Sequence, residues 1–142
     1  MEFNLDRVPV WSTEFPDRSG GVASILEPLA QAGSNLEFIL SRRMPHKPGF
    51  GELYVAPITG PNQTRAAHAV HLHHAHDLVL LRIRGKDRPG LGHFLASCLA
   101  NAGLNLQSLT MSAIDGRFVA FVACDNPEDT AKAIQALANL NL

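Results

Sequence analysis

The sequence predicts an α+β protein made of two copies of one unit, and three observations support this prediction. The stretch DRSGG…LAQAGSNLE at 17–37 returns as DRPGL…LANAGLNLQ at 87–107. Each stretch follows a run in which apolar residues alternate, as in a strand, and contains an apolar stripe with the helical period. Two more strand-like runs and a second helix-like run come after each stretch. The 142 residues therefore read as two units of order β-α-β-β-α.

The repeat is detailed enough to align the two copies and to place their boundary. Residues 17–36 and 87–106 are identical at nine of 20 positions, where unrelated stretches would share roughly one. The match resumes at a smaller offset of 66, with the pairs Pro61/Pro127, Thr64/Thr130 and Ala67/Ala133. The first copy thus carries four extra residues in 44–51, which we interpret as a longer hairpin loop than 114–116. The predicted domains are 1–74 and 75–142.

Each copy begins with a strand and a helix. The strands are expected at 8–15 and 78–84, and both are followed by a glycine-containing turn. The helical stripe of the second copy consists of Leu91, Phe94, Leu95, Cys98, Leu99 and Ala102. The corresponding positions of the first copy are Gly21, Ser24, Ile25, Pro28, Leu29 and Ala32, and Pro28 is expected to kink or loosen this helix. Gly33 and Gly103 are the predicted left-handed ends of the two helices.

Two strands and a helix complete each copy. The strands are expected at 35–43 and 52–58, and again at 105–114 and 116–123. Asn126 is a suitable N-cap for the last helix, and Pro127 suits its first position. This split β-α-β order predicts a ferredoxin-like unit, an antiparallel sheet with helices on one face. A fourth strand is poorly visible in either copy, which indicates a short strand or pairing of strands across the copies.

These residues resemble the ACT domain family. The features shared with it are a strand ending in D-R-x-G, a helix ending in L-A-x-A-G, and NL at the start of the next strand. ACT domains are small β-α-β-β-α-β modules that bind amino acids or similar ligands and regulate metabolism. The chain is similar to stand-alone ACT pairs, a class that includes the glycine cleavage system transcriptional repressor. The second copy has the fuller motif, since Ser19 replaces proline in the first.

The turn between strand and helix is the predicted ligand site. Unpaired amides at a helix N-terminus favour an anion such as a carboxylate, and Gly20 and Gly90 allow the backbone to approach a ligand closely. The side chains of Asn35 and Asn105 offer donors and an acceptor to a zwitterion. In the ACT family the ligand lies near this loop, where two units meet. The resemblance implies a site formed by Asp17, Arg18, Gly20, Gly21, Val22 and Asn35, and one formed by Asp87, Arg88, Gly90, Leu91, Gly92 and Asn105.

The expected function is regulatory and not enzymatic. We find no catalytic constellation and no motif for a cofactor, and Leu95 stands where the dinucleotide fingerprint needs its third glycine. Ligand binding would shift the balance between arrangements of the units, and exposed strand edges favour a homodimer. An unidentified protein partner would recognise the favoured arrangement. The alternative is that both turns are structural only, in a module that associates without a ligand.

Charge and composition indicate which kinds of partner and which cellular compartment to expect. The net charge of −1 argues against a nucleic-acid partner, and Phe118 and Phe121 are three apart, unlike the stacking aromatics of an RNA-binding sheet. No apolar run is long enough for a membrane span. The acidic N-terminus is unlike a signal peptide, and Cys98 and Cys124 read as buried thiols. The expected location is cytoplasmic.

A cluster of histidines lies at the join between the copies, where a metal site is conceivable. The stretch HAVHLHHAH contains His68, His71, His73, His74 and His76. On a helix, His71 and His74 would share a face. Without cysteine or carboxylate partners at ligand spacing this pattern is weak, and no metal is predicted. His93, in the first turn of the second copy's helix, is an exposed helical residue or a peripheral ligand contact.

Overall fold

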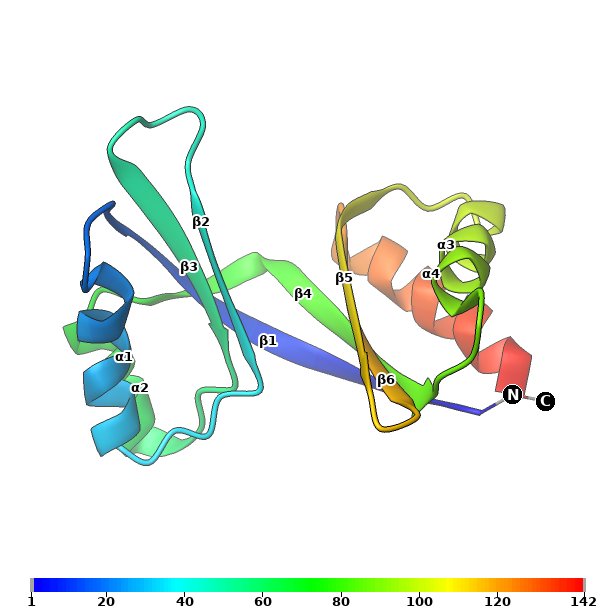
Figure 1. Cartoon of the computed structure of the whole chain (residues 1–142), viewed down its shortest axis with the longest axis horizontal. Helices are drawn as coiled ribbons and strands as arrows, with labels where there is room; N and C mark the ends of the chain where they lie inside the picture. Colours follow the sequence, from blue (N-terminus) through cyan, green and yellow to red (C-terminus); the bar gives the residue numbers. More distant parts are fainter. Residues whose placement is uncertain (1, 142) are drawn as a thin grey trace. The chain divides into compact units, whose positions relative to one another are not determined.

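The fold is α+β, with four α-helices and an antiparallel sheet, as expected (Figure 1). The structure is a computed structural model that describes residues 2–141, with the side chains of all of these except His76, Asp77 and Asn141. The elements in chain order are β1 (Phe3–Pro16), α1 (Gly21–Gln31), β2 (Phe38–Arg43), β3 (Phe50–Ala56), α2 (Gly60–Ala69), β4 (His73–Lys86), α3 (Leu91–Asn101), β5 (Leu106–Ile114), β6 (Arg117–Cys124), α4 (Pro127–Ala138) and a short 3-10 helix (Asn139–Asn141).

Contacts divide the chain into two compact units. The first unit is Pro9–His76, and the second consists of residues 2–8 together with 77–141. The repeat had placed the boundary between 74 and 75, and it had assigned the N-terminal residues to the first copy. In the structure these residues pack with the second copy instead, because Phe3 joins its core.

The strands follow the order β2-β3-β1-β4-β6-β5. In the first unit β3 pairs antiparallel with both β1 and β2, and in the second unit β6 pairs antiparallel with both β4 and β5. Each unit therefore repeats one arrangement, in which the last strand of the hairpin lies next to the long strand. The hairpin loops differ in length as predicted, since β2 and β3 are separated by 44–49 and β5 and β6 by Asp115 and Gly116 alone.

Both long strands begin earlier than the sequence indicated. We expected strands at 8–15 and 78–84, whereas β1 starts at Phe3 and β4 starts at His73. The additional residues include the polar Asn4, Asp6 and His74, which hide the apolar alternation. In the second unit Asp6 is held by Arg82 and Arg84, each with a guanidinium nitrogen 3.2 Å from its carboxylate.

The paired helices begin and end in the same way. Gly20 and Gly90 stand before α1 and α3 with φ angles of 82° and 79°, a left-handed conformation that suits glycine. Gly33 and Gly103 follow the helices with φ angles of 83° and 79°. The left-handed helix ends at these glycines are therefore confirmed. The next amides, of Ser34 and Leu104, donate back to the carbonyls of Leu29 and Leu99, so both ends are Schellman motifs.

Each unit has its own core on the face of its strands that the helices cover. In the first unit Ile25 and Leu29 of α1 and Ala67 of α2 pack on Trp11 and Leu53 of the strands. In the second unit Leu91, Leu95 and Leu99 of the predicted stripe are buried in the core. Phe94 and Cys98 are only half-buried, and Ala102 is exposed. Figure 1 shows α1 beside α2 and α3 beside α4.

The second helix of the second unit begins as the sequence predicted. The side chain of Asn126 accepts a hydrogen bond of 2.9 Å from the amide of Asp129, and Pro127 opens α4. None of the helices among residues 2–141 has the length and apolar character needed to cross a bilayer.

Candidate functional site

The two predicted turns have the same backbone hydrogen bonds. The amide of Asp17 donates to the carbonyl of Gly49, and the amide of Asp87 donates to the carbonyl of Gly116, both over 2.9 Å. The next bond closes each turn: Gly21 donates to Arg18 over 3.1 Å, and Leu91 donates to Arg88 over 3.3 Å. The turns at 17–21 and 87–91 are thus tied to the hairpin of their own unit, and the sequence repeat is a repeat of geometry.

The N-cap residues of α1 and α3 are the glycines Gly20 and Gly90, so neither helix has the side-chain cap that an N-cap residue usually provides. The amides of Val22 and Gly92, one residue into each helix, have no acceptor inside the helix. These amides, together with the positive end of the helix dipole, give each turn the capacity to hold an anion.

The first turn borders a cavity of about 330 Å³. Arg18 and Gly21 line it, so the structure brings these two predicted residues together. Much of the wall is apolar, from Phe15, Pro16, Ile25, Ala69 and Val70, while Glu14, Ser24 and His71 add polar groups. Asp17 instead forms an ion pair with Arg43, with 2.8 Å between the Nε of Arg43 and a carboxylate oxygen.

The second turn borders a cavity of about 580 Å³ with a different lining. Asp87 and Arg88 of the predicted set take part, with Glu2, Asn4, Gly85, Lys86 and Arg117. The guanidinium of Arg88 also lies 4.7 Å from the centre of the Phe94 ring, a distance at which cation and ring attract each other. Both cavities fall in the range of about 300–1,000 Å³ that is usual for small-molecule sites.

Glycine has a packing role at Gly21. A side chain there would place its Cβ 3.0 Å from the Phe15 ring and 3.3 Å from the carbonyl of Pro16. At Gly20 and Gly90 the space is open, and the positive φ alone favours glycine. Leu91 is buried in the core of the second unit. A Cβ at Gly92 would lie 3.8 Å from the sulfur of Met111, which is an ordinary contact distance.

The two predicted asparagines lie away from the turns of their own units. Leu106 pairs with Cys124 at one end of the hairpin, whereas Ile114 and Arg117 meet at the other end, next to Asp87. A nine-residue strand spans roughly 26 Å between these ends. Asn105 precedes β5 and is therefore far from 87–91, and Asn35 stands in the same relation to 17–21.

Sequence reasoning missed several residues that line these cavities. Lys86 and Arg117 adjoin the second turn, and Glu14 and His71 adjoin the first. A signal was available for Lys86, which directly precedes the motif. Arg117 could be found only from the register of the hairpin, since Lys86 and Arg117 are cross-strand partners.

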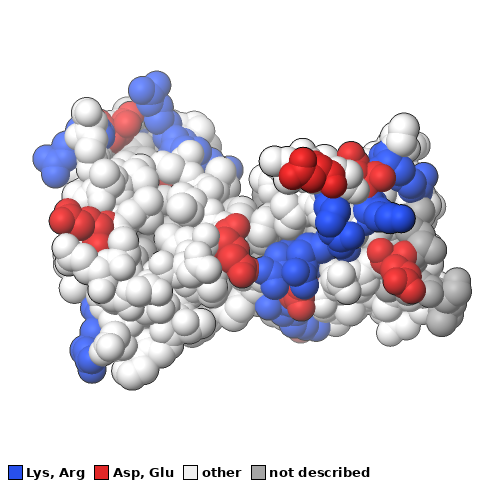
Figure 2. Space-filling model, turned by 60° about the horizontal axis from the view of Figure 1, so that its bottom comes forward, with Lys and Arg blue, Asp and Glu red and all other residues white. Residues whose placement is uncertain are grey.

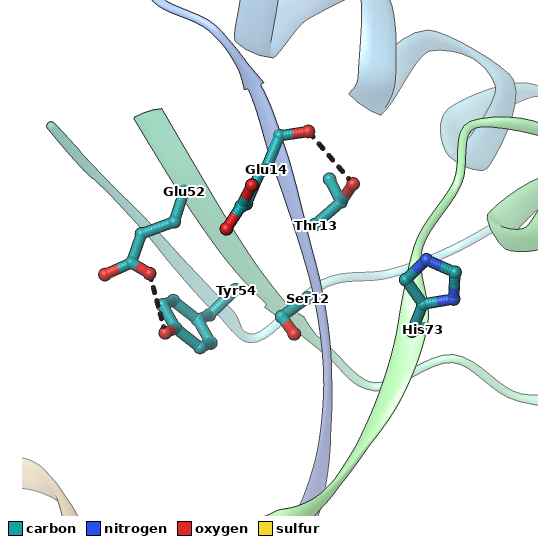
Figure 3. A pocket seen from close by; sticks show the side chains of 6 residues that line it. All are labelled: Ser12, Thr13, Glu14, Glu52, Tyr54 and His73. Carbon is teal, nitrogen blue, oxygen red and sulfur yellow. Dashed lines mark hydrogen bonds between the residues drawn. The ribbon is translucent and has the colours of Figure 1, made fainter. Parts of the chain in front are cut away.

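A third cavity, of about 410 Å³, lies on the first unit and was not expected. It is lined by Ser12, Thr13, Glu14, Glu52, Tyr54 and His73. Figure 3 shows Glu14, Glu52 and Tyr54 extending from β1 and β3, with His73 of β4 on the other side. Glu52 and Tyr54 alternate with the core residues Leu53 and Val55, so this is the strand face away from α1 and α2.

The acidic groups of this cavity are already engaged. The Tyr54 hydroxyl donates to Glu52 over 3.0 Å, and the Nε of Arg42 donates to the same carboxylate. Burial is the main cause of a raised pKa of Tyr54, and the hydrogen bond to Glu52 raises the pKa of Arg42. Lys47 lies 2.7 Å from Glu14. The cavity is therefore polar with balanced charge.

The histidine-rich stretch is split between a helix end and a strand. Because α2 stops at Ala69 and β4 starts at His73, the stretch does not continue as one helix. His68 and His74 both contact the ring of Trp11, with 5.4 Å between ring centres. Among the residues whose side chains are described, no three histidine, cysteine or acidic groups are arranged as metal ligands.

The comparisons with known proteins agree with the fold. No protein-family model and no curated protein matches the sequence. Among solved structures, protein BT0572 from Bacteroides thetaiotaomicron is similar with a TM-score of 0.78 and 17% identity, over 96% of this chain and 90% of that one. The ligand-free regulatory subunit of aspartate kinase from Thermus thermophilus is similar with a TM-score of 0.64 and 17% identity, over 96% and 95%. The regulatory subunit of aspartate kinase from Thermus flavus is similar with a TM-score of 0.62 and 17% identity, over 97% of this chain and 94% of that one. At this identity the likeness concerns the fold, and it supports an ACT-like one.

Proposed function

We propose that the chain is a non-enzymatic regulatory protein that binds an amino acid or a similar small ligand at its two strand-to-helix turns. Its functional units would be two tandem ACT-like modules, each containing one copy of the repeated motif, at 17–37 and 87–107. One observation carries the proposal: each turn leaves helix amides without a capping side chain and borders a cavity of the size of a ligand site. The similar solved structures include regulatory subunits of an enzyme, which favours a regulatory role.

The chemistry of the first turn suits an amino acid with an apolar side chain. The ligand carboxylate would face the amide of Val22 and the guanidinium of Arg18, as an anion at a helix N-terminus does. Phe15 and Ile25 would cover the side chain, because apolar surface removed from water stabilises the complex.

A bound ligand would act by shifting a population of arrangements. A ligand that fits one arrangement of the modules better than another moves the equilibrium by the difference between its two affinities. Asn35 and Asn105 lie away from the turn of their own unit, so their predicted role depends on a ligand that spans two modules. A partner protein would then recognise the favoured arrangement.

A thermal-shift screen of the twenty amino acids tests the proposal. A ligand at 100 times its dissociation constant adds about 2.7 kcal/mol to the free energy of unfolding. Arg18→Gln and Arg88→Gln should each weaken the response of one turn, and Asn105→Ala should remove it if the ligand spans modules. Arg65→Gln on α2 and Lys132→Gln on α4, which remove exposed cations away from both cavities, are the matched controls. No response to any amino acid would refute the proposal.

A structural module that associates without a ligand is the second candidate. Exposed apolar side chains favour it: Ile39, Leu109 and Ile114 on the hairpins are 51%, 41% and 77% exposed. Strands β2 and β5 end the strand order, so their outer edges can pair with a second copy. A homodimer is compatible with both candidates. Light scattering that gives a ligand-independent dimer, with no thermal response, would select the structural module.

A further inference from the structure

Two cations of the second unit face each other without a counter-ion. Lys86 and Arg117 are direct partners in the antiparallel register of β4 and β6. Both side chains are exposed, and within the described residues neither lies at ion-pair distance from a carboxylate. Like charges opposite each other weaken a sheet. The repulsion between Lys86 and Arg117 therefore lowers the stability of the fold, and no carboxylate among the described residues offsets it through an ion pair.

The first unit contains a like-charge pair whose two members both have counter-ions within the chain. Glu14 and Glu52 are also direct cross-strand partners, on β1 and β3. Each has its own counter-ion, because Lys47 lies 2.7 Å from Glu14 and Arg42 bonds to Glu52. The difference indicates that the counter-charge for Lys86 and Arg117 is to come from outside the chain.

Strand pairing does not require charge at this position. The residues of the first unit that correspond to Lys86 and Arg117 are Pro16 and Phe50, which pair at the same place in the register and are uncharged. The second copy thus has two cations where the first has an apolar pair. This substitution lies at the wall of a cavity next to the predicted turn.

The cavity concentrates positive charge around the turn. Its lining holds Lys86, Arg88 and Arg117 against the acidic Glu2 and Asp87. In Figure 2, Lys and Arg side chains gather over the second unit, with carboxylates at their margins. Arg88 belongs to the turn at 87–91, whereas Lys86 and Arg117 form the cross-strand pair. The lining therefore offers an anionic group two places, at the pair and at Arg88 of the turn.

We propose that the cavity of the second unit takes a small molecule with two anionic groups, such as an acidic amino acid or another dicarboxylate. One carboxylate lies between Lys86 and Arg117, and the other faces the turn at 87–91. The identity of the ligand as an amino acid rests on the proposed function, whereas the preference for two negative charges rests on the cations alone. The first unit, with Pro16 and Phe50 at these positions, has no such preference.

Matched ligand pairs test the preference for two charges. Aspartate against asparagine, glutamate against glutamine, and succinate against succinamate each differ by one carboxylate. They are titrated at constant ionic strength into the 15N-labelled chain, and the amide signals of Gly85, Gly90 and Gly116 report the second unit. At least one dicarboxylate of the three should bind about tenfold more tightly than its partner, since a charge-assisted contact is lost. Its affinity should fall as salt is added.

Variants separate this inference from the proposed function. Lys86→Gln and Arg117→Gln should each reduce the affinity for the dicarboxylate about tenfold, and Lys132→Gln should leave it unchanged. A neutral amino acid that binds the second unit with equal affinity in all variants would overturn the inference and leave the proposed function standing. Succinate binding without any amino acid response would do the reverse. Failure of all three dicarboxylates, or an equal loss in Lys132→Gln, would overturn the inference.

Discussion

The two turns share a backbone but are packed in opposite ways. In the first unit a large residue, Phe15, stands between two glycines, Gly21 and Gly51. In the second unit the matching position is Gly85, and large residues, Leu91 and Phe118, take the places of the two glycines. The register shows this directly, since Phe15 pairs with Gly51 and Gly85 pairs with Phe118.

The exchange shows that a turn geometry can be kept while its surroundings are rebuilt. The backbone hydrogen bonds of the turn are the same in both units, although the ring comes from the long strand β1 in the first unit and from the hairpin strand β6 in the second. The wall of each cavity changes with the packing, because Phe15 lines the first cavity and Gly85 lines the second. A repeated motif therefore does not imply a repeated ligand.

The largest change in the free energy of unfolding is expected when one residue of either packing arrangement is substituted alone. Phe15→Ala removes a buried ring and should lower the free energy of unfolding by about 3–5 kcal/mol. Gly85→Ala should cost about 1–3 kcal/mol by overpacking, because its Cβ would lie 3.0 Å from both the carbonyl of Glu2 and the Phe118 ring. Urea denaturation measures both changes.

Copying the second arrangement into the first unit sharpens the test. The triple variant Phe15→Gly, Gly21→Leu and Gly51→Phe should be more stable than the sum of the three single changes by about 0.5–3 kcal/mol, as expected for residues in contact. Additive single effects would mean that the three residues do not form one packing unit, and the proposed exchange would then be wrong.

The sequence predicted those parts of the fold that rest on local patterns. The stripe with Leu91, Leu95 and Leu99, and the glycines Gly33 and Gly103, depend on residues within one helix, and the structure confirms them. The starts of β1 and β4 depend on partners far along the chain. Asp6 contacts Arg82 and Arg84, 76 and 78 residues away, and no local pattern shows that β4 lies next to β1.

In the candidate site, too, the local features could be predicted from the sequence and the long-range contacts could not. The backbone of each turn could be predicted, since glycine at Gly20 and Gly90 marks a positive φ. The walls could not be predicted, because Lys86 and Arg117 meet only through the hairpin register and His71 reaches its cavity from the end of α2. The roles of the predicted residues in binding stay predictions.

The next effect concerns a helix end that only the first unit has. His71 follows α2 with a φ of 64°, and the amide of Leu72 donates to the carbonyl of Ala67 over 2.9 Å. A left-handed conformation costs a residue with a side chain about 1–2 kcal/mol. His71→Gly should therefore raise the free energy of unfolding by up to about 1 kcal/mol, because the flexible unfolded glycine offsets part of the gain.

A control for His71→Gly is the reverse change at the other helix ends. Gly33→Ala and Gly103→Ala should each destabilise the protein, by about 1 kcal/mol, because both positions have positive φ. Chemical denaturation compares all three variants. A destabilised His71→Gly would show that the contacts of the imidazole outweigh the strain of its backbone.

A similar effect distinguishes the second helices of the two units. Asn126 accepts a bond from the amide of Asp129, whereas Thr59 makes no side-chain bond to the amides of α2. Asn126→Ala should cost about 1 kcal/mol, and Thr59→Ala should cost clearly less. Hydrogen exchange in the first turns of α4 and α2 locates the change. Equal losses would mean that the two helix starts do not differ in capping.

The smallest effect concerns the ion pair that distinguishes the first turn. Asp17 and Arg43 are joined over 2.8 Å, but their side chains are 36% and 87% exposed, and such pairs contribute about 0.2–1 kcal/mol. Arg43→Ala should therefore change the free energy of unfolding by less than about 1 kcal/mol, and less still in high salt. A double-mutant cycle with Asp17→Ala isolates the pair. A coupling well above that value would mean that the ion pair holds the first turn, whereas a small one means that the backbone bond from Asp17 to Gly49, which the second turn repeats without the ion pair, is sufficient.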